Sequence, residues 1–176
     1  MSSTPNLRFK LDPTLSEELR EQLTQIWTDV SNADGAVGFV PPTTVEAVRP
    51  VAEEAFQRSA TQKDHIIVAF VEEQPIGFVF LTGRPGALFG HWATVKRLQV
   101  HPDSQGSGIG GALIEAVHEM ARDQLGMEQL LLTVRGGTGR ERFYERHGYN
   151  EVARIPGLIR VAPGDDRDEI YMTREL

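Results

Sequence analysis

The sequence contains no cysteine, which excludes disulfides, thiolate metal sites and cysteine nucleophiles together. It also has no apolar run close to the roughly 20 residues that are needed to cross a bilayer. Residues 1–5 lack the charged and apolar parts of a secretory signal. These absences predict a cytoplasmic protein with no membrane partner.

Basic residues are outnumbered, because 18 Lys and Arg stand against 25 Asp and Glu, for a net charge of -7 at pH 7. Sequence-independent binding of nucleic acid requires clustered cations that neutralise phosphates, so no nucleic-acid partner is expected. The sign of the charge mildly favours a cationic or amine-bearing substrate. No metal is expected.

A chain of 176 residues can bury one substantial core, and we expect one domain spanning residues 1–176. Hydrophobic alternation and β-branched composition predict strands at about 6–11, 65–71, 75–82, 92–100, 129–134, 149–155 and 168–174. Helical spacing and capping signals predict helices at about 14–30, 43–60, 108–125 and 140–147. Meander strands come first and a strand-helix-strand-helix unit follows, which predicts a mixed α+β or α/β sheet.

Three details of these helices can be tested. Thr14 and Glu17 have the spacing of a capping box at the start of the first helix. Pro50 predicts a bend in the second helix. His118 is expected on the exterior of the third.

A glycine-rich loop, Gln105–Gly111, lies between an expected strand and an expected helix. Backbone N–H groups in such a loop can approach a ligand without side chains in between, and the helix start adds unpaired donors and a partial positive charge. A diphosphate would fit there. The alternative is a flexible turn whose glycines allow close helix packing.

Two other phosphate-binding patterns fail at this loop. A Walker loop requires Lys-Ser or Lys-Thr after its last glycine, but Gly111 is followed by Ala112 and Leu113. A Rossmann fingerprint opens a βαβ fold after the first strand. Here the glycines match that fingerprint only loosely, and they follow the hairpin of a mixed sheet.

The loop carries the pattern Gln-x-x-Gly-x-Gly, and Leu-Gln-Val-His-Pro precedes it at 98–102. With these residues the sequence resembles the GNAT superfamily of N-acetyltransferases over nearly all of its length, and the segment 97–110 is highly specific for it. Within the superfamily the chain is similar to the tabtoxin resistance acetyltransferase group. That narrower similarity rests on 35–39, 141–144 and 155–157.

The resemblance implies a single GNAT-type domain with a central mixed, twisted sheet of about seven strands flanked by about four helices. It also implies acetyl-CoA as cosubstrate, with its diphosphate on the loop amides and its pantetheine arm along the preceding strand as a pseudo-strand. One strand amide would polarise the thioester carbonyl, and a preorganised donor of this kind can be worth about 3 kcal/mol. The residues implied are Leu98, Gln99, Val100, Gln105, Gly106, Ser107, Gly108, Ile109, Gly110 and Gly111.

Tyr144 falls where the superfamily usually has the tyrosine that protonates the departing CoA thiolate, in contact with the cosubstrate. A phenol is a plausible acid, because the thiolate would otherwise leave as an unprotonated anion. A tyrosine on a short helix is more often a packing residue. Its position after Gly136-Gly-Thr-Gly139 and before Gly148-Tyr149 favours the catalytic role.

The resemblance does not identify the general base. Members of the tabtoxin resistance group carry acidic residues at positions that align with Thr94 and Thr133. The amine would therefore lose its proton through water held by these threonines or by backbone carbonyls, or through His91. The other histidines that were considered are given no part in catalysis: His101, His118 and His147.

Candidates for the acceptor pocket are Asp34, Phe39, Trp92, Thr94, Thr133 and Arg135. Several of these have a structural alternative: Asp34 in an Asp-Gly turn, Phe39 and Trp92 in the core, and Arg135 as a solvated strand end. The acidic run at 165–169 could attract a cationic substrate or form a solvated turn.

The leading hypothesis is direct acetyl transfer from acetyl-CoA to the primary amine of a small molecule, such as an antibiotic or an amino-acid-like toxin, with no covalent acyl-enzyme. One alternative is a non-catalytic CoA-binding regulatory module, which the two threonines would support. Another is an acetyltransferase that modifies protein lysines or N-termini. Many members of the superfamily pair as dimers, so a homodimer is a candidate assembly.

Overall fold

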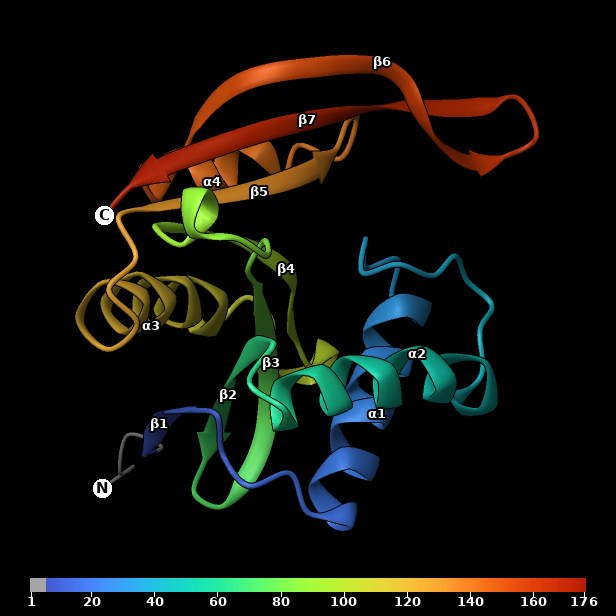
Figure 1. Ribbon diagram of the computed structural model, residues 1–176. Coiled ribbons are helices and arrows are strands. Elements are labelled where there is room, and N and C mark those ends of the chain that lie inside the picture. Colours follow the sequence, from blue (N-terminus) through green and yellow to red (C-terminus); the bar gives the residue numbers. More distant parts are fainter. Residues whose placement is uncertain (1–5) are drawn as a thin grey trace.

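The computed structural model describes residues 6–176, and the expectation about a secretory signal at 1–5 therefore lies outside the described residues. Within this part, seven strands form one mixed sheet in the order β1-β2-β3-β4-β5-β7-β6 (Figure 1). The strands are β1 (Leu7–Leu11), β2 (Asp64–Val71), β3 (Gln74–Thr82), β4 (Trp92–Val100), β5 (Gln129–Arg135), β6 (Asn150–Ala162) and β7 (Asp165–Glu175). The α-helices are α1 (Glu17–Asn32), α2 (Val45–Ala60), α3 (Ile109–Asp123) and α4 (Glu141–Arg146), with short 3-10 turns η1 (Ala87–Phe89) and η2 (Pro102–Ser104). The expected mixed sheet of seven strands with four flanking helices is confirmed.

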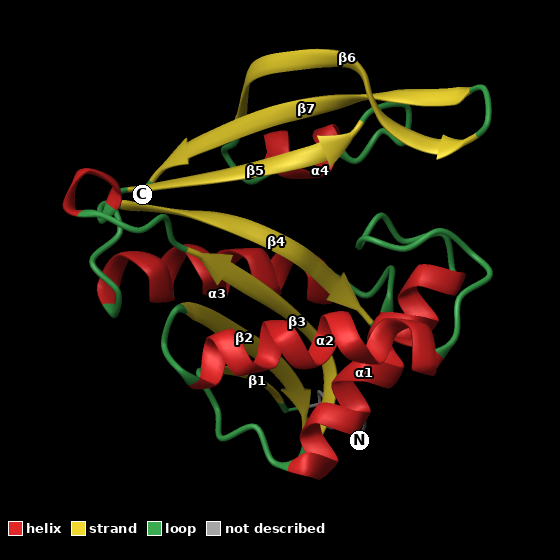
Figure 2. Ribbon diagram, turned by 45° about the vertical axis from the view of Figure 1, so that its right-hand side comes forward, coloured by secondary structure: helices red, strands yellow, loops and turns green. Residues whose placement is uncertain are grey.

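Helices α1 and α2 cover one face of the sheet at β2, β3 and β4 (Figure 2). The indole of Trp27 is fully buried there, with its ring centroid 6.0 Å from that of Phe78 and 6.0 Å from that of Phe80. Its Nε1 donates a hydrogen bond to the Val37 carbonyl at 2.9 Å. This bond ties the segment after α1 to the core, because the buried indole N–H needs an acceptor.

The start of α1 differs from the capping box that was expected at Thr14. The N-cap is Ser16, whose hydroxyl accepts a hydrogen bond from the Leu19 amide at 3.2 Å. The helix therefore begins at Glu17, and Glu17 is a first-turn residue whose charge favours the helix N-terminus. In α2 the cap is Thr44, and the helix continues through Pro50 as far as Ala60.

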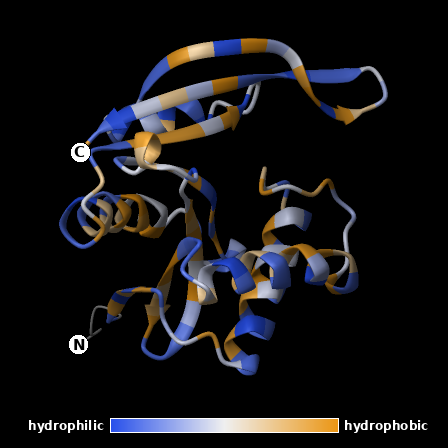
Figure 3. Ribbon diagram, in the orientation of Figure 1, coloured by the Kyte–Doolittle hydropathy of each residue, from blue (hydrophilic) through white to orange (hydrophobic). Residues whose placement is uncertain are grey.

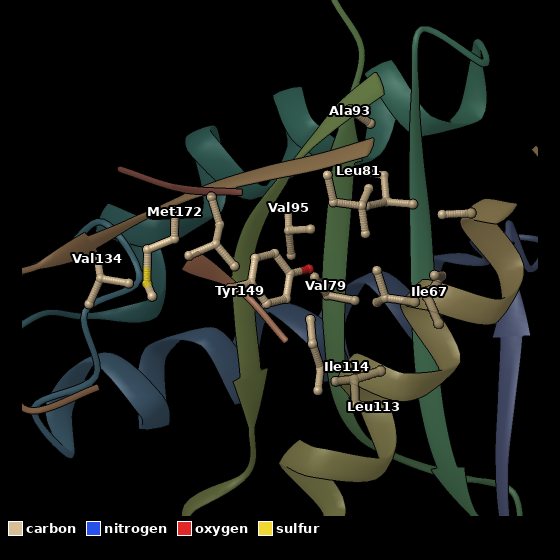
Figure 4. Close-up of a cluster of buried hydrophobic side chains, with 14 of the residues drawn as sticks. Ile67, Val79, Leu81, Ala93, Val95, Leu113, Ile114, Val134, Tyr149 and Met172 are labelled. Carbon is tan, nitrogen blue, oxygen red and sulfur yellow. The ribbon is translucent and has the colours of Figure 1, made fainter. Parts of the chain in front are cut away.

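Helix α3 packs on the opposite face of the sheet, against β1, β3 and β4. Successive strand residues point to opposite faces, so Ile67 joins the core under α3 while Ile66 joins the core under α1 and α2. Figure 4 shows Leu113 and Ile114 of α3 against the strands, with Tyr149 among them.

The expectation that His118 lies on the exterior of α3 is wrong, because its side chain is only 3% exposed. Its Nε2 lies 3.2 Å from the hydroxyl of Tyr149, which is itself buried. The phenol supplies the partner that makes burial of an imidazole tolerable. This contact joins residues 31 positions apart, so helical periodicity could not indicate it.

Strands β4 and β5 are parallel neighbours that separate along their length (Figure 2). Their pairing covers Trp92–Thr94 opposite Gln129–Leu131. The backbone of Arg97 then has a left-handed φ of 56°, and the register between β3 and β4 shifts at the same place. This irregularity turns the end of β4 away from β5, which opens a gap toward the C-terminal ends of both strands.

The β6–β7 hairpin is longer than expected, and Figure 1 shows it extending past the end of β5. The acidic run at 165–169 lies inside β7 and does not form a solvated turn. Arg160 Nε lies 2.6 Å from Asp166 Oδ1, and Arg167 pairs with Asp165. These ion pairs sit beside the hairpin turn, and hydrophobic and hydrophilic residues mix along β6 (Figure 3). None of the helices in residues 6–176 has the length and apolar composition of a membrane span.

Candidate functional site

A cavity of about 580 Å³ lies where the end of β4, the glycine loop and α4 meet. Tyr144 and most of the residues expected to bind the cosubstrate line it. These are Leu98, Gln99, Val100, Gln105, Gly106, Gly108, Gly110 and Gly111. Of the other two, Ser107 donates its hydroxyl to the Ser104 carbonyl at 2.6 Å, and Ile109 packs against the core. The structure therefore brings eight of the ten expected residues and Tyr144 together at one cavity, while the other two residues of the loop point elsewhere.

The loop presents open backbone at the start of α3. Gly108 is the N-cap, with a left-handed φ of 85° and no side-chain cap. A Cβ added to it would meet nothing within 4 Å, so the space in front of it is free. The first backbone hydrogen bond of α3 runs from the Ala112 amide to the Gly108 carbonyl at 3.0 Å. The amides before Ala112 have no intrahelical acceptor, which is the arrangement that binds anions.

Gln105 supports the shape of the loop. Its side-chain Nε2 donates to the Val100 carbonyl at 2.8 Å, and its backbone N–H donates to the Pro102 carbonyl at 3.1 Å. These bonds hold the loop against the end of β4. The role is structural, and it explains why a glutamine starts the pattern that the sequence shows.

The charged side chains that line the cavity are all basic, although the chain as a whole is acidic. They are Arg140 and Arg146, which sequence reasoning did not single out, and the imidazole of His147, which it gave no part in catalysis, lines the cavity beside them. The His147 imidazole lies beside the loop, since a Cβ added to Gly111 would meet its Nε2 at 3.3 Å. Arg140, Tyr144 and His147 face the cavity together because each lies about one helical turn from the next. That spacing was the signal available in the sequence.

Tyr144 lines the cavity from α4, with its ring edge-on to Phe143 at 5.0 Å and to Tyr149 at 5.7 Å between centroids. Burial raises the pKa of Tyr144 to about 12, and the nearby Arg140 opposes part of that rise. The hydroxyl therefore keeps its proton at neutral pH, as a general acid must.

Gln99 contributes an unsatisfied polar atom to the same cavity. Its Nε2 donates to the Arg97 carbonyl at 3.2 Å, while its buried Oε1 has no hydrogen-bond partner among the described residues. A buried acceptor without a partner is costly. It fits a ligand that brings an amide N–H along β4, and a pantetheine arm has two such groups.

Asp34 and Arg135, two of the residues expected to bind the acceptor, meet in a second cavity of about 370 Å³. The Arg135 guanidinium lies 3.9 Å from the Asp34 carboxylate. The remaining lining residues come from three segments. They are Gly137, Thr138, Arg140, Val161, Asp165 and Arg167. Arg140 lines both cavities, so the two are neighbours.

The other candidates for the acceptor pocket lie outside both cavities. Phe39 packs against Trp27, with ring centroids 6.2 Å apart, which is the core alternative. Trp92 and Thr94 lie in the paired end of β4, opposite Gln129 and Leu131. The neighbouring His91 is exposed, and its carbonyl accepts a hydrogen bond from the Glu128 amide at 2.8 Å.

Thr133 is exposed on the face of β5 that also carries Arg135, because Leu132 and Val134 point into the core. Its cross-strand neighbour on β7 is Tyr171, whose hydroxyl donates to Glu169 at 2.8 Å. Glu169 is in turn opposite Arg135. Glu169 is thus a carboxylate on the face of Thr133, although sequence reasoning considered it only as part of the acidic run at 165–169.

No group of three or more His, Asp or Glu side chains in residues 6–176 is arranged to hold a metal ion. Residues 62–151 match the family model of the acetyltransferase (GNAT) domain, which spans about half of the chain and includes the glycine loop and α4. The chain belongs to the GNAT acetyltransferase family. The enzyme class that the sequence predicts, an acetyl-CoA-dependent N-acetyltransferase, is confirmed at the level of this family.

Solved structures share the fold of this GNAT chain. A candidate phosphinothricin N-acetyltransferase superimposes with a TM-score of 0.78 at 19% identity, over 97% of this chain and 99% of that one. A candidate acetyltransferase from Salmonella typhimurium, solved with acetyl-CoA, has a TM-score of 0.74 at 16% identity, over 97% and 94%. An aminoglycoside 6'-N-acetyltransferase in complex with coenzyme A has a TM-score of 0.73 at 15% identity, over 96% of each chain. No curated protein sequence matches this chain.

Proposed function

We propose that this chain acts as one domain, residues 1–176, that transfers acetyl from acetyl-CoA directly to the primary amine of a small molecule. One observation carries the proposal. The open helix start, the free edge of β4 and the protonated Tyr144 all line a single cavity whose charged residues are basic.

Acetyl-CoA would occupy this cavity with its diphosphate, its pantetheine arm and its acetyl thioester. The amides at the start of α3 would bind the diphosphate, with the Arg146 guanidinium and the His147 imidazole beside it. The free edge of β4 and the unpaired Oε1 of Gln99 would bind the amides of the pantetheine arm. When bound, acetyl-CoA supplies the activated acetyl group as a thioester.

Groups of the protein would then stabilise the charge that develops on the carbonyl oxygen and transfer a proton to the leaving sulfur. The amine nitrogen forms a bond to the thioester carbonyl carbon, and the carbon–sulfur bond breaks. A backbone amide within Leu98–Val100 would stabilise the negative charge on the carbonyl oxygen. Tyr144 gives its proton to the departing sulfur and regains one from solvent, so the products are the amide and the free thiol.

The proton on the attacking nitrogen needs a separate route. We assign it to water on the exposed face of β5, where Thr133 lies diagonally across from Glu169. The Glu169 carboxylate, held by the Tyr171 hydroxyl at 2.8 Å, would take that proton. This assignment replaces the acidic residues that the tabtoxin resistance group carries at the positions of Thr94 and Thr133.

A small antibiotic or amino-acid-like toxin is the acceptor class that we favour. The resemblance to the tabtoxin resistance group supports it, and so does the fold shared with a candidate phosphinothricin N-acetyltransferase. Acetylation of such an acceptor would take place in the cytoplasm, where acetyl-CoA is available. A homodimer through the edge strand β6 is supported by its exposed apolar side chains, Val152, Ile155 and Leu158.

The test is an acetylation assay with a panel of primary amines, in which release of the CoA thiol and the mass of each product are followed together. We expect a small amine to gain one acetyl group, and Tyr144→Phe to slow that reaction. CoA binding without acetylation of any amine would instead support the regulatory module. Acetylation of lysine peptides alone would support the protein-modifying alternative.

A further inference from the structure

The residues that line the second cavity indicate a chemical group on the acceptor, and this inference rests on the proposed function. We propose that the acceptor bears an acidic group beside its amine, and that Arg135 and Arg140 bind this group in the cavity that they share. The site would take a carboxylate, phosphonate or phosphinate.

The burial and the distant counter-ion of Arg135 are the main evidence for an anion site. Its side chain is only 14% exposed, yet its ion pair to Asp34 spans 3.9 Å, close to the limit of such a contact. Asp34 is 85% exposed, so its carboxylate remains largely in water. Because this mostly buried guanidinium has such a distant counter-ion, some of its N–H donors remain available to a ligand. Two of them form a planar pair that matches the two oxygens of a carboxylate.

The other nearby carboxylates, Glu169 and Asp165, do not complete the pairing. Glu169 is directly opposite Arg135 in the β5–β7 register, but it accepts a hydrogen bond from Tyr171. In residues 6–176, Asp34 supplies the one carboxylate within 4.0 Å of Arg135. Arg167 also lines the cavity, and Asp165 pairs with it directly.

Arg140 is the second open cation. Its Nη2 donates to the backbone carbonyl of Asp34 at 3.2 Å, and no carboxylate in the described part of the chain pairs with its charge. It lines both cavities, and its charge lowers the pKa of Tyr144 against the effect of burial, so it lies near the proposed acid. An anion held between Arg135 and Arg140 would therefore sit next to the place where acetyl is transferred.

This local charge reverses what the net charge of the chain indicated. A net charge of -7 favoured a cationic substrate, whereas the two under-compensated groups in this cavity are guanidiniums. The exposed Asp34 at the rim can attract the ammonium of an amino acid while the arginines hold its acid. A polyamine, which has no acid, would gain nothing from them.

The decisive experiment compares acids with matched neutral amides. L-Alanine, L-methionine and phosphinothricin are assayed beside L-alaninamide and L-methioninamide, with spermidine as a polycation. We expect kcat/KM for the best acid to exceed that for its amide by at least about tenfold. Arg135→Gln should raise KM for acids about 10-fold to 100-fold and leave KM for amides unchanged.

Arg160→Gln is the matched control, because Arg160 is an exposed β6 arginine paired with Asp166 outside the cavity. It should behave as the parent protein. If Arg135→Gln does not fold, Arg135→Lys provides the same test, since it keeps the charge but loses the planar fork and should raise KM for acids by a smaller factor.

Three results would overturn the proposal. Amides or spermidine could react as well as acids, which would leave the proposed transferase function standing without an acid subsite. Arg135→Gln could weaken binding of CoA but not of dephospho-CoA, which would assign the arginines to the donor's phosphate. If no amine is acetylated at all, titration of phosphinothricin into the CoA-bound protein decides separately, and equal heats for parent and Arg135→Gln would refute the site.

Discussion

The Nδ1 atom of His147, at the end of α4, lies 2.7 Å from Oε1 of Glu115 on α3. The same carboxylate reaches the buried His118 with its other oxygen, at 3.4 Å. The hydrogen bond from His147 holds the pKa of Glu115 below its usual range. The carboxylate therefore orients the His147 ring, whose Nε2 side faces the glycine loop at Gly111.

His147→Gln should weaken CoA binding about twofold to fivefold and leave pantetheine binding unchanged, because the imidazole lies beside the phosphate end of the cavity. The effect is modest because the side chain is partly exposed to solvent. Calorimetry with CoA and with pantetheine measures the difference. Glu119→Gln, an exposed change on α3, is the control, and an equal loss of affinity for both ligands would contradict the phosphate role.

Gly108→Leu should abolish CoA binding, because the new side chain would occupy the free space in front of the loop amides. Gly126→Leu is a matched control. Gly126 also has a left-handed φ, of 66°, and open space around it, but it follows α3 at the far end. Both variants should lose similar stability in urea, and only Gly108→Leu should lose the ligand. Unchanged affinity in Gly108→Leu would remove the diphosphate from this loop.

Tyr144→Phe should lower kcat about 100-fold while the affinity for acetyl-CoA stays within about twofold, since the ring still packs but the proton donor is gone. Because burial raises the pKa of Tyr144 to about 12, the parent enzyme should not lose this proton at any pH up to about 10. Rates and affinities measured from pH 6 to pH 10 check both statements. Unaltered turnover at saturating substrate would show that Tyr144 is a packing residue.

His118 should make the protein less stable in mild acid. Burial lowers the pKa of His118 to about 4, whereas an unfolded histidine titrates near about 6.5. Between these values the unfolded state binds a proton that the folded state does not, so stability falls as the pH drops through this window. His118→Gln should remove up to about 3 kcal/mol of that fall.

Urea unfolding at pH 7 and pH 4.5 measures this effect as the difference between variant and parent. His65, whose pKa is raised by its hydrogen bond to Asp12, contributes equally to both proteins and cancels. The exposed His91→Gln is the control and should match the parent at each pH. Parallel curves for His118→Gln and the parent would show that its burial has no cost.

Much of the fold could be predicted because its signals are local. β-branched and aromatic runs marked β2, β3 and β4, and the loop 105–111 was found because its glycines lie between a strand and a helix. One error arose where distant contacts decide. The burial of His118 is such a case, because its partner Tyr149 lies 31 positions away. The cap of α1 is a local error, because both Thr14 and Ser16 can fill that role.

The candidate site was predicted in part. Pattern placed residues 98–100 and Tyr144 at one cavity, which the fold does bring together. It could not indicate that Arg140 would line two cavities, since that depends on how α4 packs beside the segment at Asp34. It also could not indicate the left-handed backbone of Arg97, at which β4 turns away from β5.

The short parallel pairing of β4 with β5 has a mechanical consequence. Three residues on each strand join the β1–β4 half of the sheet to the β5–β7 half, and the rest of that junction is open. An extended ligand arm that forms hydrogen bonds with the free edges of both strands would connect the two halves of the sheet. Occupancy should therefore slow amide exchange in β5 and make the two halves unfold together.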